Sequence, residues 1–277
     1  TQSRSSAASD VYKRQILICA LTAVINLIGA LAYAARIAGV RTRRIALSFA
    51  LFNILLLVSR TSNGFLGPFL AKRIETALAS GGGDALLFDL RMVLFSAAGA
   101  VLLGILMVPT GQRLFAAAIT FFQANRSTTK LLLRSVTPAG LHTIRDSVAL
   151  PSAETLRSLR KPRGVSWSVL AANAVAQGLL AVGVLASLYA GYLVPEFRVT
   201  ASQMSAIVNG FATILLFALI DPQISALTDD VVDGAVSEPV FRRAMIWVSL
   251  SRLVGTLLAQ ALLVPAAVVI AYAAGWL

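Results

Sequence analysis

The stretch "LFNILLLVSRTSNGFLGPFL", residues 51–70, is apolar enough to enter a bilayer, yet it contains Arg60, whose guanidinium stays charged at any working pH. Apolar residues make up 57% of the chain and charged residues 13%, whereas a soluble domain carries about 25% charged residues. The mean hydropathy is +0.80, and several apolar runs reach the ~20 residues that a helix needs to cross a membrane. These features predict an all-α polytopic membrane protein.

Six apolar runs have the length of a membrane span. They cover residues 16–35, 45–68, 92–109, 167–193, 203–221 and 245–272. The first connection carries four arginines and no acid, and the third, residues 110–166, carries nine basic residues against two acidic ones. Because cytoplasmic loops are enriched in Lys and Arg, both connections are predicted to lie in the cytoplasm, with both termini outside.

The long connection, residues 110–166, contains two stretches in which Leu or Phe alternates with Arg or Lys at helical spacing, residues 113–136 and 151–164. Helices of this kind lie at a charged lipid surface, so we predict amphipathic cytoplasmic helices in contact with anionic membrane lipids. A solvated basic loop is the alternative reading.

The first fifteen residues, "TQSRSSAASDVYKRQ", share no compositional feature with the apolar run that starts at Ile16. We interpret them as a non-native leader and assign residues 16–277 to a single transmembrane domain. Functional residues are therefore sought after residue 15.

The two halves of this domain are similar when the chain is shifted by 156 residues. The shift pairs the first three spans with the last three, and it places Asn53 on Asn209 and Gly99 on Gly255. Because each half holds three spans, the second half would enter the membrane in the opposite orientation, as in transporters with inverted repeats. We predict two inverted three-helix repeats, and chance similarity in an Ala- and Leu-rich chain is the alternative.

Several classes of function lack the residues that they need. Basic residues lie between hydrophobic runs, where they set topology, so nucleic-acid binding is not expected. Cys19 has no partner for a disulfide, and His142 is the only histidine, so no metal site or cofactor is expected. The glycines at 81–83 lack the Lys-Ser/Thr of an ATPase phosphate loop, and no hydrolase motif occurs. A transporter is favoured over an enzyme.

Ionisable residues within spans are the first candidates for function, because they cost about 2.5–3.5 kcal/mol on insertion scales and face a bundle interior or a wet cavity. Three occur here: Arg60 in the second span, Asp221 at the end of the fifth and Arg252 in the sixth. Either arginine could instead reach a nearby interface or pair with Asp221 as a structural contact.

Amide side chains accompany both arginines. Asn53 and Asn63 share a helical face with Arg60, and Gln260 follows Arg252 by about two turns. Gly64, Gly67 and Pro68 are expected to weaken the second span just after Arg60, which frees backbone groups that need polar partners. Two arginines from different spans could therefore converge, with amide donors, on one anion.

The segment "RIAGVRTRRIALSFALFNILLLVSRTSNGFLGPFLAKRIE", residues 36–75, resembles the start of the Amj family of bacterial lipid II flippases, known as alternate to MurJ. The most specific portion is "AGVRTRR" followed by "VSRTSN", and the similarity extends over nearly the whole chain after residue 15. The resemblance implies a multi-pass protein of the bacterial cytoplasmic (inner) membrane. It also implies transfer of the undecaprenyl-pyrophosphate-linked peptidoglycan precursor, lipid II, from the inner to the outer leaflet for cell-wall synthesis.

The leading hypothesis combines this resemblance with the polar residues of the spans. Arg60 and Arg252 would bind the pyrophosphate, because a planar guanidinium suits phosphate oxygens, with Asn53, Asn63 and Gln260 as further donors. Cytoplasmic arginines would gather the anionic headgroup before entry. These are Arg36, Arg41, Arg43 and Arg44.

Two other functions are compatible with the same residues. One is an ion-coupled carrier for a small soluble anion, with Asp221 as the coupling group. The other is a non-transporting scaffold that recruits a wall-synthesis enzyme through residues 110–166. The energy source, the oligomeric state and the preference for lipid II over other polyprenyl-pyrophosphate lipids are not specified by the sequence.

Overall fold

The computed structural model describes residues 2–80, 83–151, 162 and 164–277, and the secondary structure in these ranges is helical throughout. The main helices are α1 (Gln2–Arg41), α2 (Ile45–Ser80), α3 (Gly83–Leu106), α4 (Val108–Asn125), α5 (Thr128–Ser135), α6 (Pro138–Ser147), α8 (Trp167–Leu193), α10 (Ser205–Leu215), α11 (Asp221–Val232) and α12 (Glu238–Ala274). Shorter turns between α8 and α11 are η1 (Pro195–Phe197), α9 (Arg198–Gln203) and η2 (Leu216–Ile220).

Six segments of the described chain are long and apolar enough to cross a membrane, which confirms the predicted number of spans. They are Tyr12–Arg41, Ile45–Ala79, Gly83–Leu106, Trp167–Leu193, Pro195–Val232 and Glu238–Ala274. The fourth agrees with the predicted range. The first, second, fifth and sixth extend beyond it at one or both ends, whereas the third begins nine residues before the predicted start and ends three residues before the predicted end. The predicted spans are shorter because they were drawn from apolar runs, which stop where polar residues begin at the helix ends.

Two helices continue through sequence that was expected to interrupt them. α2 runs on past Pro68 to Ser80, so the predicted weakening after Arg60 does not end the helix. α3 begins at Gly83 rather than at residue 92, and its additional turns carry Asp89, which forms an ion pair with Arg73 of α2. Because this pair is largely buried, the two charges neutralise each other at the end of the bundle.

The fifth span is a series of helical pieces rather than one regular helix. α10 passes into one turn of π-helix, η2, and then into α11, which begins at Asp221-Pro222. Proline lacks an N–H and its ring collides with the carbonyl of the preceding turn, and a π-turn opens the helix enough to accommodate it. The span was predicted to end at residue 221, whereas the helix resumes and continues to Val232.

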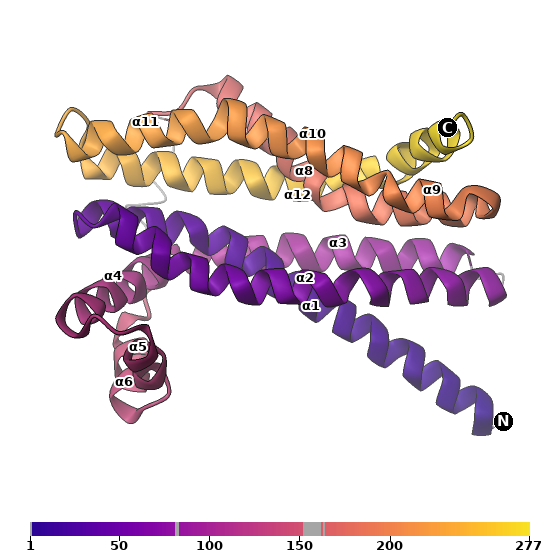
Figure 1. The fold of residues 1–277 in the computed structure, drawn as a ribbon, viewed down its shortest axis with the longest axis horizontal. Helices are drawn as coiled ribbons and strands as arrows, with labels where there is room; N and C mark the ends of the chain where they lie inside the picture. The colour runs from indigo at the N-terminus through magenta and orange to yellow at the C-terminus, as the bar shows by residue number, and fades with distance from the viewer. Residues whose placement is uncertain (1, 81–82, 152–161, 163) are drawn as a thin grey trace.

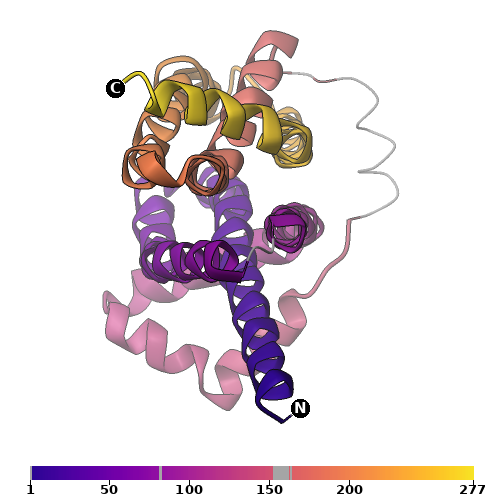
Figure 2. The same ribbon diagram turned by 90° about the vertical axis from the view of Figure 1, so that its right-hand side faces the viewer.

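The spanning helices form two layers, one containing α1, α2 and α3 and the other containing α8 to α12 (Figures 1 and 2). Within the first layer α1 packs against both α2 and α3, and within the second α8 packs against both α10 and α12. The first helix of each layer, α1 or α8, is therefore the one that packs against the other two main helices of that layer. The inverted repeat itself stays a prediction.

Both termini lie at one end of the bundle, and the turns 42–44 and 233–237 lie at the other, together with α4 (Figure 1). We call this second end the basic end, because it carries the arginine-rich first and third connections. The arrangement agrees with the parity predicted for six spans. Helices α4, α5 and α6 extend away from the bundle there (Figure 1), and the predicted helix at 151–164 lies almost wholly outside the described residues.

The apolar core is divided into two clusters along the bundle. One contains buried apolar residues between Ile28 and Val40 of α1, together with Leu51 and Phe52 of α2 and Val248 of α12, toward the basic end. The other contains Ile18, Leu70 and further residues toward the opposite end. Between the two clusters the helices carry polar side chains, and the candidate site lies there.

Candidate functional site

A cavity of about 380 Å³ lies between the two apolar clusters, and all six spanning segments contribute to its wall. Its polar lining consists of Thr22 and Asn26 of α1, Ser59, Arg60 and Asn63 of α2, Gln177 of α8, Asn209 of α10 and Arg252 of α12. The remaining lining is apolar and includes Leu70, Leu94 and Leu185. A polar, two-arginine cavity at the centre of a membrane bundle is the strongest candidate for a functional site.

The depth of the cavity follows from the positions of its residues along the helices. Arg60 lies fifteen residues after the start of α2, about 22 Å along the helix axis, and nineteen residues before the end of that spanning segment. Arg252 is fourteen residues from the start of α12 and twenty-two from its end. These distances exceed the reach of an arginine side chain, so neither guanidinium extends to an end of its own spanning helix.

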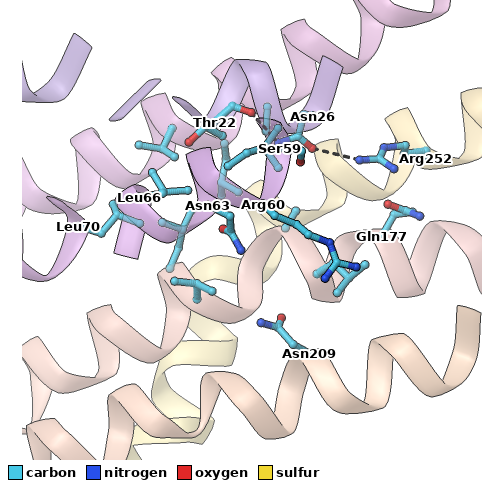
Figure 3. Close-up of a pocket in the computed structure, with 18 of the residues that line it drawn as sticks. Thr22, Asn26, Ser59, Arg60, Asn63, Leu66, Leu70, Gln177, Asn209 and Arg252 are labelled. Carbon is cyan, nitrogen blue, oxygen red and sulfur yellow. Dashed lines mark hydrogen bonds between the residues drawn. The ribbon is translucent and has the colours of Figure 1, made fainter. Parts of the chain in front are cut away.

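The two arginines approach the cavity from opposite layers. Arg252 reaches Asn26, whose side-chain oxygen lies 3.5 Å from its terminal nitrogen, while its Nε atom is buried without a partner in the described structure. Arg60 extends toward Gln177 and Asn209 (Figure 3). Among the described residues none forms a hydrogen bond or ion pair with Arg60, and none that lines the cavity is a carboxylate.

Further polar atoms of the cavity wall are also unsatisfied within the described structure. Thr22 Oγ1 and Asn209 Oδ1 are buried and have no hydrogen-bond partner there. Buried polar groups in proteins are normally paired, so a polar ligand or water is needed at these positions. Two permanent cations and several neutral amides, without a lining carboxylate, make the cavity suited to an anion.

Two glycines make room for these polar groups. A Cβ at Gly29 of α1 would overlap the guanidinium of Arg252, and a Cβ at Gly183 of α8 would overlap the side-chain oxygen of Asn209. Because the obstructed atoms are the ends of side chains, a larger residue at either position would displace the polar group while leaving the helices in place. The backbone of both layers is thus shaped around the cavity.

The structure brings together three of the five residues predicted to bind substrate: Arg60, Asn63 and Arg252 line the cavity. It does not bring Asn53 or Gln260 there. Asn53 is exposed, about 10 Å before Arg60 along α2, because sharing a helical face does not place two residues at the same depth. Gln260 instead donates a hydrogen bond to the backbone carbonyl of Arg91 on α3, at 3.0 Å.

The other predicted residues lie at the basic end. Arg36 faces Asp221 with 3.4 Å between nitrogen and oxygen, and its guanidinium also lies 5.0 Å from the ring centre of Phe49. This ion pair joins α1 to α11. The other three arginines of the first connection are exposed; they are Arg41, Arg43 and Arg44.

The other polar residues of the cavity wall were not among those predicted to bind substrate; they are Thr22, Asn26, Ser59, Gln177 and Asn209. The shift of 156 residues pairs Asn53 with Asn209, but only Asn209 lines the cavity, so this pairing does not locate the site. Thr22 and Asn26, spaced by four residues, mark one polar face of α1.

Comparisons with known proteins give a family match over most of the chain. The family model for Amj, "Alternate to MurJ", matches residues 21–274. A protein of Bacillus subtilis (strain 168) named lipid II flippase Amj is 33% identical over 257 residues, which cover 91% of this chain and 94% of that protein. No solved structure matches the chain. With a family match over nearly its whole length, the chain belongs to the Amj family.

Proposed function

We propose that this protein is a lipid II flippase of the bacterial inner membrane, which carries the pyrophosphate-linked headgroup of the peptidoglycan precursor from the inner to the outer leaflet. The proposal extends to this chain the activity named for its Bacillus relative. The observation that carries it is the pair of arginines from different layers, both at mid-depth in one cavity. An anion crossing hydrocarbon needs cationic partners at that depth.

Arg60 and Arg252 would bind the pyrophosphate, each offering a planar set of N–H donors to phosphate oxygens. Asn26, Asn63 and Asn209 would donate further hydrogen bonds, since each amide carries two N–H groups. The cavity volume of about 380 Å³ is near the lower end of ligand pockets, so this conformation would enclose the pyrophosphate and leave the disaccharide and peptide outside. Passage of the whole headgroup then requires the two layers to move apart.

The polyprenyl tail would leave the cavity between α2 and α10. Both helices contribute to the cavity wall, but they make at most marginal contact with each other. Phe65 of α2 and Phe211 of α10 are exposed apolar side chains on these helices. A tail in this gap would remain in lipid while the charged group stays in the cavity, so no sealed pore is needed.

The test is transport by the purified protein in liposomes that contain fluorescent lipid II. Flipping is measured as the fraction of probe that becomes accessible to a membrane-impermeant quencher, with and without proton and potential gradients. We expect Arg60→Gln and Arg252→Gln each to reduce the flipping rate at least tenfold, because each removes a charge-assisted contact. Arg91→Gln is the matched control, since Arg91 is an exposed arginine of α3 outside the cavity.

Three outcomes would contradict the proposal. Equal activity of Arg60→Gln, Arg252→Gln and the Arg91→Gln control would reject the cavity as the binding site. Uptake of a small soluble anion in liposomes free of polyprenyl lipids, without lipid II flipping, would favour an anion carrier. Absence of any transport by well-folded protein would favour a scaffold.

A further inference from the structure

A second pocket lies at the basic end, where the turn between α1 and α2 meets the end of α4. It has a volume of about 660 Å³. Its lining is formed by Arg43, Arg44, Ile45, Ala46 and Leu47 on one side and by Phe122, Gln123 and Arg126 on the other. Three arginines from segments about eighty residues apart therefore share one pocket.

None of these arginines has a carboxylate partner within the described residues. The ion pairs there join Arg36 to Asp221, Lys72 to Glu75, Arg73 to Asp89 and His142 to Asp146. Three arginines that line one pocket make its electrostatic potential positive, which favours an anion there. Gln123 adds an uncharged amide donor to the same wall.

The backbone holds two of the three arginines in an unusual conformation. Arg43 has φ 54° and Arg126 has φ 46°, and they are the two non-glycine residues of the described chain with positive φ. Side chains other than glycine pay roughly 1 kcal/mol or more to adopt this left-handed region, so glycine or asparagine is the usual choice there. Arginine at both positions, in the same pocket, is costly for stability and suggests that the guanidinium itself is needed.

The turn that carries Arg43 and Arg44 is fixed by neighbouring contacts. Ser48 of α2 donates a hydrogen bond to the carbonyl of Ala35 at 2.6 Å, and the Arg44 N–H donates to the carbonyl of Gly39 at 2.9 Å. A rigid turn presents the two guanidinium groups without a large loss of backbone freedom on binding. The pocket lies at the start of the second spanning segment, because Ile45 both lines the pocket and begins that segment.

We propose that this tri-arginine pocket, formed by Arg43, Arg44 and Arg126, binds a phosphate or diphosphate group at the membrane surface, separately from the central cavity. The group can belong to a lipid headgroup or to a free anion, since both present the same oxygens. If the bound group belongs to a lipid headgroup, the inference rests on the proposed flippase function. The pocket would then be the first docking site of the pyrophosphate, before it moves to Arg60 and Arg252.

The test is binding to the full-length protein, measured in two settings. Inorganic pyrophosphate is titrated calorimetrically into protein in detergent. In nanodiscs of phosphatidylcholine, a short-chain polyprenyl diphosphate is titrated against the same protein. Variants are Arg126→Gln, Arg126→Gly and the double variant Arg43→Gln with Arg126→Gln. Arg134→Gln is the matched control, because Arg134 is also an exposed basic-end arginine but stacks on Phe121 outside this pocket.

We expect Arg126→Gln and Arg126→Gly to weaken binding about tenfold or more, the double variant to weaken it further, and Arg134→Gln to have little effect. Arg126→Gly keeps the conclusion independent of folding, because glycine relieves the left-handed backbone while removing the charge. Binding in the nanodisc but not in detergent would assign the pocket to lipid headgroups; binding in both would extend it to free anions.

Equal losses in the Arg126 and Arg134 variants would overturn the inference, because they would show only a general effect of positive charge. So would unchanged binding in the double variant. Arg60→Gln separates this site from the central cavity. If Arg60→Gln abolishes binding and the Arg126 variants do not, the tri-arginine site is rejected while the proposed flippase cavity is supported. If the Arg126 variants abolish binding and Arg60→Gln does not, the tri-arginine site is supported and the central cavity is not.

Discussion

Substitution of Gly255 by alanine tests the packing that holds the two helices of the second layer together. A Cβ at Gly255 of α12 would overlap the backbone carbonyl of Ala174 on α8, and it would lie 3.0 Å from the backbone nitrogen of Gly178. A Cβ at Gly178 would in turn lie 3.0 Å from the Gly255 carbonyl oxygen. The backbones of α8 and α12 therefore touch at this crossing, as small residues allow in membrane helices.

Because backbone atoms cannot move aside as a side-chain end can, Gly255→Ala must push α8 and α12 apart. Overpacking of this kind costs about 1–3 kcal/mol. Alanine also favours the helix over glycine by about 1 kcal/mol, and this gain partly offsets the cost. The displacement matters for function too, since Arg252 lies less than one turn before Gly255 on the same helix.

Gly99 provides the matched control. It is the position paired with Gly255 by the shift of 156 residues, it lies in α3, and a Cβ there would meet nothing within 4 Å. The helix-propensity gain is the same at both sites and cancels in the comparison. We therefore expect Gly99→Ala to be neutral or stabilising and Gly255→Ala to unfold more easily by a difference of about 1–3 kcal/mol.

The measurement is reversible unfolding in mixed micelles of detergent and SDS, followed by loss of helical circular dichroism. Both variants and the wild type are titrated under one set of conditions, so that the free energies of unfolding can be compared directly. Equal free energies for Gly255→Ala and Gly99→Ala would refute the close backbone contact between α8 and α12.

Other predictions concern the cavity and the basic end. Gly29→Ala should displace the Arg252 guanidinium and lower lipid II flipping by tenfold or more, while the unfolding free energy changes little because only a side-chain end must move; normal flipping would show that the position of Arg252 is unimportant. Asn209→Ala should slow flipping severalfold and Asn53→Ala should not, since only Asn209 lines the cavity. Asp221→Asn should change the free energy of unfolding by about 1 kcal/mol or less, because its ion pair is partly exposed; if Asp221 is also the coupling group, flipping by this variant will no longer respond to an imposed proton gradient.

The number of spans could be predicted because long apolar runs have few alternatives in a membrane. Their ends could not, since a polar residue at a helix end can be neutralised by a partner on another helix. Asp89 shows this, because its pairing with Arg73 allows α3 to begin nine residues earlier than expected. Likewise, the fifth span was predicted to end at residue 221, because the sequence does not reveal the π-turn that lets the helix continue past Pro222.

The candidate site was predictable in its charged members and, among its amides, only in Asn63. An arginine within a span has a high cost wherever it lies, so Arg60 and Arg252 stood out from the sequence. Amides cost less and can pair locally or with any nearby backbone, as Gln260 does with Arg91. The amides that lie near the arginines are set by the level at which each helix crosses its neighbours. Local sequence patterns do not predict that level.

The position of Arg60 within an apolar run also bears on how transport could proceed. Without an anion, the cavity holds two positive charges that must remain hydrated, which opposes closure of the layers around them. A bound pyrophosphate would neutralise both guanidinium groups and accept hydrogen bonds from the unpaired Thr22 hydroxyl and Arg252 Nε–H, while the unpaired Asn209 Oδ1, an acceptor, would need a water molecule as its donor. We infer that the loaded cavity closes more readily than the empty one, so that the substrate itself lowers the cost of the step in which its charge crosses the membrane. In this scheme Arg60 would be available to the anion because no described residue pairs with it.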